Sequence, residues 1–128
     1  MKQLFRVNKI AVIFWMLLTS AAIHAQVSSP VPANMPFRHG LGHENYEAKC
    51  ALCHGGSLQG TEQGPPLFHR YYVPSHHGDA AFYRAIRSGT RQHHWNFGDM
   101  PPVAGVGEND ARAIVEFIRW FQRASKLY

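Results

Sequence analysis

The sequence has no long apolar segment, no concentration of basic residues and few cysteines. Its apolar run at residues 10–18 is nine residues long, whereas a membrane-spanning helix needs roughly 20. No cluster of Lys and Arg is interleaved with aromatic residues, which argues against nucleic-acid binding. The two cysteines are too few for a zinc site rich in thiolates. These absences argue against a membrane-embedded protein, a nucleic-acid-binding protein and a thiolate-rich zinc protein.

The amino terminus has the pattern of a secretory signal peptide. Lys2, Arg6 and Lys9 precede the apolar run, small residues follow it, and Ala25 offers a cleavage site. An uncleaved anchor is the alternative, but the run is too short to span a bilayer. We therefore expect residues 1–25 to be removed on export to the periplasm, and the mature protein to have no membrane span.

The mature chain would be one small domain. Removal of residues 1–25 leaves 103 residues and lowers the formal net charge from +5 to +2. A chain of this size can bury only a modest core and gains stability from a built-in apolar ligand. Residues 26–40 are rich in proline and small polar residues, which predicts a flexible leader. The domain is expected over residues 41–128, without strands, repeats or a second domain.

Both cysteines stand in Cys50-Ala51-Leu52-Cys53-His54, the C-x-x-C-H pattern of c-type haem attachment. In that chemistry two thiols bind the haem covalently, and the histidine after them becomes the proximal ligand of the iron. The alternatives are a dithiol redox pair, a structural disulfide and part of a zinc site. The adjacent His54, the predicted export and the lack of a surrounding βαβ pattern favour one covalent haem c.

Three helices are expected, which makes the fold all-α. A short helix over residues 43–53 would deliver Cys50 to the haem, and a second would run over residues 79–88 between Gly78 and Gly89. The third would begin at residues 107–110 and end near residue 124. Its apolar stripe has helical spacing: Ala111, Ile114, Val115, Ile118 and Phe121. The charged residues mostly on its other side are expected to be solvated rather than a partner-binding patch: Arg112, Glu116, Arg119 and Arg123.

A second axial ligand is expected downstream, and Met100 is the best candidate. It lies in Gly98-Asp99-Met100-Pro101-Pro102, in the loop between the second and third predicted helices. Together, His and Met suit an electron-transfer haem, because the soft thioether favours ferrous iron and leaves no open site for oxygen chemistry. The prolines would stiffen the backbone beside the ligand. Met35, in the predicted leader, is a poor rival.

Over residues 40–124 the chain resembles the class I, or monohaem, cytochromes c. The resemblance rests on Tyr46 before the C-x-x-C-H motif, Gly64-Pro65-Pro66-Leu67, Met100-Pro101-Pro102 and the closing amphipathic helix. It implies the cytochrome c fold, with three main helices and loops wrapped around one covalently bound haem c. It also implies that the first and last helices cross near Gly42, Tyr46 and Phe117. The carbonyl group of Pro65 would accept the second ring hydrogen of His54.

The domain is also rich in histidine, with His76-His77 in one loop and His93-His94 in the loop leading to Met100. Four roles are open for these residues. They could bond to backbone, haem propionates or water, bind a second metal such as copper, make the haem sensitive to pH, or replace Met100 as the axial ligand. Trp95 and Phe97, nearby, are expected to wall the haem pocket.

The function expected from these features is one-electron transfer in the periplasm, without catalysis of a reaction on a substrate. Redox proteins would dock transiently at an exposed haem edge. One alternative is a haem c subunit of a periplasmic dehydrogenase or oxidase complex, which would co-purify with a larger catalytic chain. Another is a haem sensor, which would bind carbon monoxide because its Met100 bond would be absent or labile.

Overall fold

The structure, a computed structural model, describes residues 31–128. In chain order its elements are η1 (Phe37–His39), α2 (Gly40–Lys49), α3 (Ala51–His54), η2 (Arg70–Tyr72), α4 (Asp79–Ser88) and α5 (Glu108–Ala124). The described residues contain no β-strand, only isolated bridges between Thr61 and Gly64 and between Thr90 and Met100. The predicted all-α class is confirmed. The predicted signal peptide, and residues 26–30 of the predicted leader, lie outside the described part of the chain.

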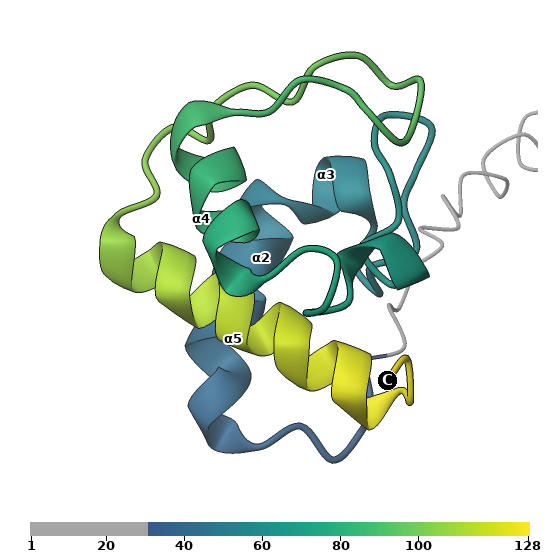
Figure 1. Cartoon of the computed structure of the whole chain (residues 1–128). Coiled ribbons are helices and arrows are strands. Elements are labelled where there is room, and N and C mark those ends of the chain that lie inside the picture. The colour runs from purple at the N-terminus through teal and green to yellow at the C-terminus, as the bar shows by residue number, and fades with distance from the viewer. Residues whose placement is uncertain (1–30) are drawn as a thin grey trace, which may run out of the picture.

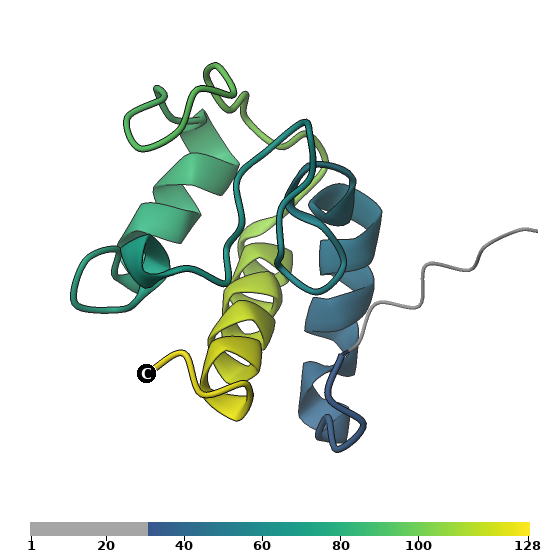
Figure 2. The same ribbon diagram turned by 90° about the vertical axis from the view of Figure 1, so that its right-hand side faces the viewer.

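Helix α5 runs across the molecule between α2 on one side and α4 on the other (Figures 1 and 2). It begins where the sequence indicates, because Asp110 accepts a hydrogen bond from the backbone N–H of Gly107 at 3.4 Å. Carboxylates in the first turn also suit the positive end of the helix dipole. All five residues of the predicted apolar stripe are buried. Their burial makes α5 the centre of the hydrophobic core.

Helices α2 and α5 cross at very close range. A Cβ atom added at Gly42 would overlap the backbone carbonyl of Ala113, so only glycine fits at this point. The rings of Tyr46 and Phe117 pack beside it with their centroids 5.4 Å apart, and both residues are fully buried. The crossing expected near Gly42, Tyr46 and Phe117 is therefore present. It holds the end of α2, from which the C-x-x-C-H motif continues.

The amino-terminal part of the domain differs from the sequence-based expectation in two ways. The first helix begins at Gly40 rather than at residue 43, and it is interrupted at Cys50, where φ is −125°. Residues of the expected leader are packed, since Val31 and Met35 lie against the core. His39 is also buried, with its ring stacked on Trp120 at 5.5 Å. Apolar contacts with the core therefore hold residues that proline content alone suggested would be loose.

The expectation that Arg119 is solvated was wrong. Its residue is only 4% exposed, whereas Arg112, Glu116 and Arg123 are exposed as expected. The guanidinium group is satisfied by four acceptors: Asp79 Oδ1, Gln122 Oε1 and the backbone oxygens of Tyr72 and His77. Four of the five guanidinium N–H donors are therefore paired, and such hydrogen bonds make a buried charge tolerable. Arg119 thus ties α5 to the segment between η2 and α4.

No helix of the described residues is both long enough and apolar enough to cross a membrane.

Candidate functional site

The C-x-x-C-H motif lies at the junction of α2 and α3. Cys50 joins the two helices, and Cys53 and His54 end α3. The hydroxyl group of Tyr46 donates a 2.7 Å hydrogen bond to the carbonyl oxygen of Gly55, directly after the motif. Because Tyr46 is packed in the α2–α5 crossing, the motif is fixed to the rigid core at this end.

The two thiols are free and partly exposed. Burial, followed by the neighbouring Cys53, raises the pKa of the Cys50 thiol to about 11. Dithiol redox centres have a lowered pKa instead, because the thiolate is the reactive species. The environment of Cys50 thus argues against the dithiol alternative.

His54 is oriented by the loop that follows it. Its Nδ1 lies 2.8 Å from the carbonyl oxygen of Pro65, which can only accept, so Nδ1 carries the proton. In the neutral ring, Nε2 then carries the lone pair needed to bind a metal. Burial lowers the pKa of His54, which favours this neutral form. The hydrogen bond to Pro65 implied by the family resemblance is present.

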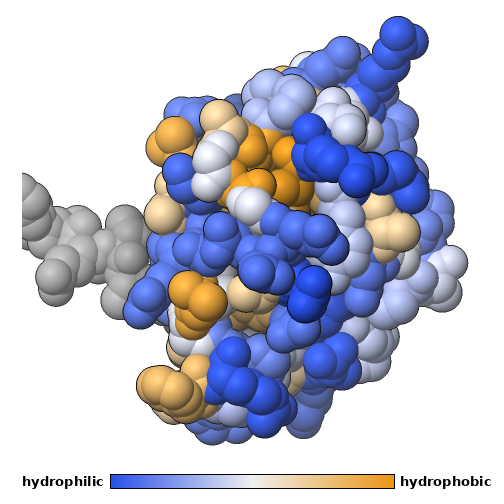
Figure 3. Space-filling model, turned by 90° about the vertical axis from the view of Figure 1, so that its left-hand side faces the viewer, coloured by the Kyte–Doolittle hydropathy of each residue, from blue (hydrophilic) through white to orange (hydrophobic). Residues whose placement is uncertain are grey.

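A cavity of about 470 Å³ lies beside the motif. Cys50, His54, Pro65 and Met100 all line it. Its wall also contains apolar side chains from the loop after the motif, from α4 and from α5: Leu67, Phe82, Ile86, Ile114 and Ile118. In the space-filling view, apolar residues gather in a hollow with hydrophilic residues around it (Figure 3). The volume is in the range of cofactor sites.

A short backbone pairing holds Met100 at the wall of this cavity. Its N–H and C=O groups exchange two hydrogen bonds of 2.9 Å with Thr90. Just before this pair, Gly89 has a φ of +72°, and a Cβ there would overlap the carbonyl oxygen of Met100. The loop from 89 to 100 therefore closes on itself, and its closure sets the position of Met100.

The residues present fit a haem group. The cavity combines an apolar wall with the thiol of Cys50, an oriented imidazole and a thioether, and Cys53 directly precedes His54 in the motif. Together these groups are the donor set of a c-type haem with two axial ligands. In addition, Nε1 of Trp95 is buried and has no hydrogen-bond partner among the described residues, although Trp95 lines the cavity. An unpaired buried donor is costly, and a haem carboxylate would satisfy it. Trp95 and Phe97 both wall the cavity, as expected.

Sequence reasoning missed two residues that shape the surroundings of the site. Arg119 and Gln122 were missed although helical spacing points to them, because Arg119 follows Val115 by four residues and Gln122 follows Ile118 by four. Gln122 donates a 2.8 Å hydrogen bond to the carbonyl oxygen of Leu67, which lines the cavity. The charge of Arg119 and the polarity of Gln122 favoured exposure, although the helical spacing of both residues places them on the buried face.

Comparison with known families gives one match. Residues 37–118 match the family described as "Cytochrome C oxidase, cbb3-type, subunit III". Comparisons with curated proteins and with solved structures find no match. The match covers more than half of the chain, from η1 to α5, and includes the C-x-x-C-H motif.

The cofactor of such a domain is haem c, bound covalently through Cys50 and Cys53 and containing iron. A haem of this kind indicates an electron-transfer role. The chain therefore belongs to the cytochrome c oxidase, cbb3-type, subunit III family, and its residues 37–118 form a monohaem cytochrome c domain.

Proposed function

We propose that this protein is a one-electron carrier of the periplasm, with His54 and Met100 as the axial ligands of its haem. When bound, the haem supplies the one-electron couple between ferrous and ferric iron. The single observation that carries the proposal is that His54, Met100 and Cys50 line the same cavity. The signal-peptide pattern of residues 1–25 supports the periplasmic location, as does the covalent haem.

The role of His54 is supported by its tautomer. Donation from Nδ1 to the carbonyl oxygen of Pro65 leaves Nε2 as the basic nitrogen and restrains the ring against rotation. Metal-binding histidines are commonly held in this way, because the partner of the second nitrogen fixes the ring and raises its basicity. Pro65 thus acts as a positioning residue for His54.

The role of Met100 is supported by its placement and chemistry. The pairing with Thr90 fixes the backbone on one side, and Pro101 and Pro102 restrict it on the other. A thioether raises the reduction potential and fills the coordination position that oxygen or carbon monoxide would otherwise use. A thioether on a restrained backbone, lining the same cavity as His54, is therefore suited to electron transfer.

Partner docking is proposed on the surface beside the motif. Leu52 lies between the two cysteines and is 76% exposed, and Phe97, on the cavity wall, is 42% exposed. Exposed apolar side chains surrounded by polar ones are typical of protein contact sites. Redox complexes are generally small and short-lived, so a few exposed apolar side chains near the motif and the cavity are sufficient for docking.

The visible absorption spectrum of the mature holoprotein tests this function. We expect low-spin c-type bands in both oxidation states and, in the ferric protein, the weak long-wavelength band of sulfur bound to iron. The reduced protein should not bind carbon monoxide. A high-spin or bis-histidine spectrum, or ready binding of carbon monoxide, would contradict the assignment of Met100 and favour a sensor.

The family match favours a second candidate, a haem c subunit of a periplasmic dehydrogenase or oxidase complex. The matched family is described as a subunit of a cytochrome c oxidase. This candidate uses the same haem ligands but predicts a permanent partner. Purification from the native source under mild conditions distinguishes the two, because a free carrier elutes alone and a subunit elutes with a larger catalytic chain.

A further inference from the structure

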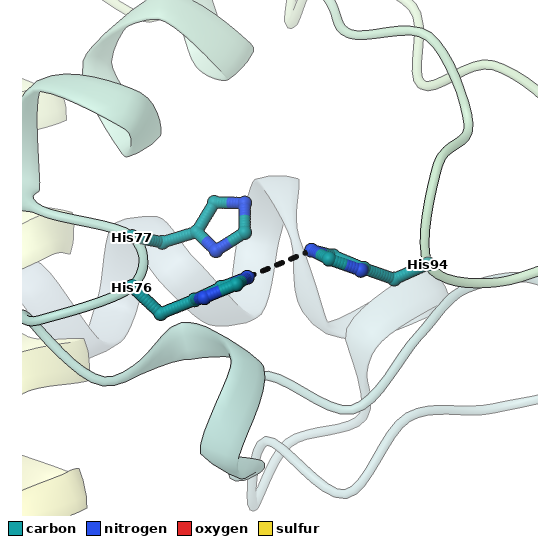
Figure 4. A group of neighbouring side chains, drawn as sticks. All are labelled: His76, His77 and His94. Atoms are coloured by element: carbon teal, nitrogen blue, oxygen red, sulfur yellow. Dashed lines mark hydrogen bonds between the residues drawn. The ribbon is translucent and has the colours of Figure 1, made fainter.

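Four histidines meet at one side of the haem cavity, and together they are called the histidine cluster: His76, His77, His93 and His94. His76 and His77 come from the loop between η2 and α4, and His93 and His94 from the loop that leads to Met100. Figure 4 shows the rings of His76 and His77 pointing across a short gap toward His94. Residues 16 to 18 positions apart in the chain are thus brought into contact.

The hydrogen bonds of His77 and His93 determine which ring nitrogens carry protons. Nδ1 of His77 lies 2.5 Å from the carbonyl oxygen of Tyr71, and Nδ1 of His93 lies 2.8 Å from that of Arg91. Carbonyl oxygens only accept, so both Nδ1 atoms are donors. In the neutral rings, both Nε2 atoms therefore carry lone pairs.

These two Nε2 atoms face each other at 3.3 Å. Two lone pairs at this distance form no hydrogen bond and repel one another, and a cation bound by both relieves the repulsion. Donation of Nδ1 to a backbone carbonyl is also the usual arrangement behind a metal-binding Nε2. The Nε2 atoms of His77 and His93 are therefore arranged to bind a positive ion and not to form a hydrogen bond between neutral rings.

The spacing of the nitrogens fits a tetrahedral ion. Nε2 of His76 lies 3.2 Å from Nε2 of His94, which gives a second pair with nearly the same separation as the first. Zinc–imidazole bonds of about 2.0–2.1 Å place neighbouring nitrogens of a tetrahedron about 3.3–3.4 Å apart. Ligand atoms of His76, His77 and His94 all lie within 4.8 Å of one another. His93 lies outside this group of three and reaches it through its 3.3 Å contact with His77, so its ring must rotate to become the fourth ligand.

We propose that the histidine cluster is a binding site for a divalent transition-metal ion, with Zn²⁺ as the ion that its geometry fits best and the four Nε2 atoms as ligands. Imidazole nitrogen is a preferred ligand of this ion, and four ligands complete its coordination. The site uses none of the residues assigned to the haem, namely Cys50, Cys53, His54 and Met100, and requires no thiol.

Both loops of the cluster are anchored. Arg119 donates to the carbonyl oxygen of His77, which connects the first loop to α5. In the second loop, the backbone of Gln92 donates to Asp99 at 3.0 Å, and the side chain of Gln92 accepts from the backbone of Gly98 at 2.9 Å. Anchored loops lower the entropy cost of gathering four ligands.

The test is titration of the tag-free holoprotein with Zn²⁺ at pH 7.5 by isothermal calorimetry. We expect one ion per chain and at least tenfold weaker binding in each of the variants His76→Ala, His77→Ala, His93→Ala and His94→Ala. His43→Gln is the matched control, because His43 lies on α2 outside the cluster. The affinity of this variant for Zn²⁺ should equal that of the wild type. Haem absorption and far-ultraviolet circular dichroism confirm that each variant is folded.

A second measurement needs no variant. X-ray absorption at the zinc edge should show about four nitrogen ligands at about 2.0–2.1 Å. Absence of saturable binding, or equal affinity in the cluster variants and the wild type, would overturn the proposal. Neither result depends on the axial ligands of the haem.

Discussion

Nε of Arg119 lies 2.7 Å from Oδ1 of Asp79, so that a buried cation of α5 is paired with the first residue of α4. The two side chains differ in environment, since that of Arg119 is 5% exposed and that of Asp79 is 56% exposed. The guanidinium group also lies over the ring of Phe82, 4.6 Å from its centroid. This contact joins the two helices whose side chains form much of the cavity wall.

Replacement of Arg119 should destabilise the domain strongly. In Arg119→Met, the carbonyl oxygen of His77 would lose its bond from Arg119, and that of Tyr72 would keep only the 3.3 Å hydrogen bond from Gln122. We therefore expect the free energy of unfolding to fall by about 2–4 kcal/mol. Urea unfolding followed by circular dichroism measures this change. Arg112→Met is the control, because Arg112 is exposed and its one ion pair among residues 31–128 is with Glu108 on the same helix. A loss in Arg119→Met as small as that in the control would show that the network contributes little.

Met100→Leu should convert the haem to one with an open or weakly held axial position. Leucine keeps the approximate size and the apolar character of methionine but has no sulfur lone pair. We expect loss of the long-wavelength ferric band, a lower reduction potential and binding of carbon monoxide to the reduced protein. Spectra and a redox titration provide the measurements, with Met35→Leu as the control. An unchanged band in Met100→Leu would refute the proposed ligand.

Gly89→Ala should disturb the position of Met100, and Gly98→Ala provides a closely matched control. Both glycines have a positive φ, +72° and +87°, so alanine is strained at either position by about 1–3 kcal/mol. Only at Gly89 would the new Cβ overlap the carbonyl oxygen of Met100, whereas a Cβ added at Gly98 would meet no atom within 4 Å outside its chain neighbours. We therefore expect a weakened long-wavelength band in Gly89→Ala alone. Equal spectra in the two variants would contradict the importance of this close approach.

The stability of the protein should depend on the protonation of His39. Burial, and then the positive charge of Arg38, lower the pKa of His39 below its usual value of 6.5. Because its pKa is lower in the folded state, the unfolded chain binds more protons below about pH 6.5, and stability falls as the pH falls through that range. Neither ring nitrogen has a hydrogen-bond partner among the described residues to offset this effect.

His39→Phe should reduce this acid sensitivity while keeping a ring against Trp120. Thermal unfolding midpoints at pH 7.5 and pH 5 provide the measurement, and the difference between them should be smaller in the variant than in the wild type. His43→Gln on α2 controls for the loss of an imidazole. If the wild type and His39→Phe lose the same stability on acidification, buried His39 is not the cause.

Local patterns in the sequence were sufficient for much of the fold. The helix over residues 79–88 has the predicted bounds, because Gly78 and Gly89 mark its ends and its apolar residues recur at helical spacing. Helix α5 was predicted for the same reason. The C-x-x-C-H motif is equally local, since the attachment chemistry requires its residues to be close together in the chain. Its assignment to haem agrees with the family match.

Contacts between distant segments could not be read in this way. The burial of Arg119 depends on acceptors 40 or more residues away, and its charge alone suggested exposure. The pairing of Thr90 with Met100, and the packing of His39 on Trp120, likewise depend on how separate segments meet. The predicted domain boundary at residue 41 remains a prediction, although residues before it already contact the core.

The sequence by itself determined the helical class, the haem attachment residues and the candidate ligand Met100, because each depends on neighbours within a few positions of the chain. Only the tertiary structure decided which side chains line the cavity and that His76 and His77 meet His93 and His94. The physical reason is that side-chain chemistry and local spacing depend only on residues close together in the sequence. Burial and the distance between loops result instead from the packing of α2 and α4 on α5.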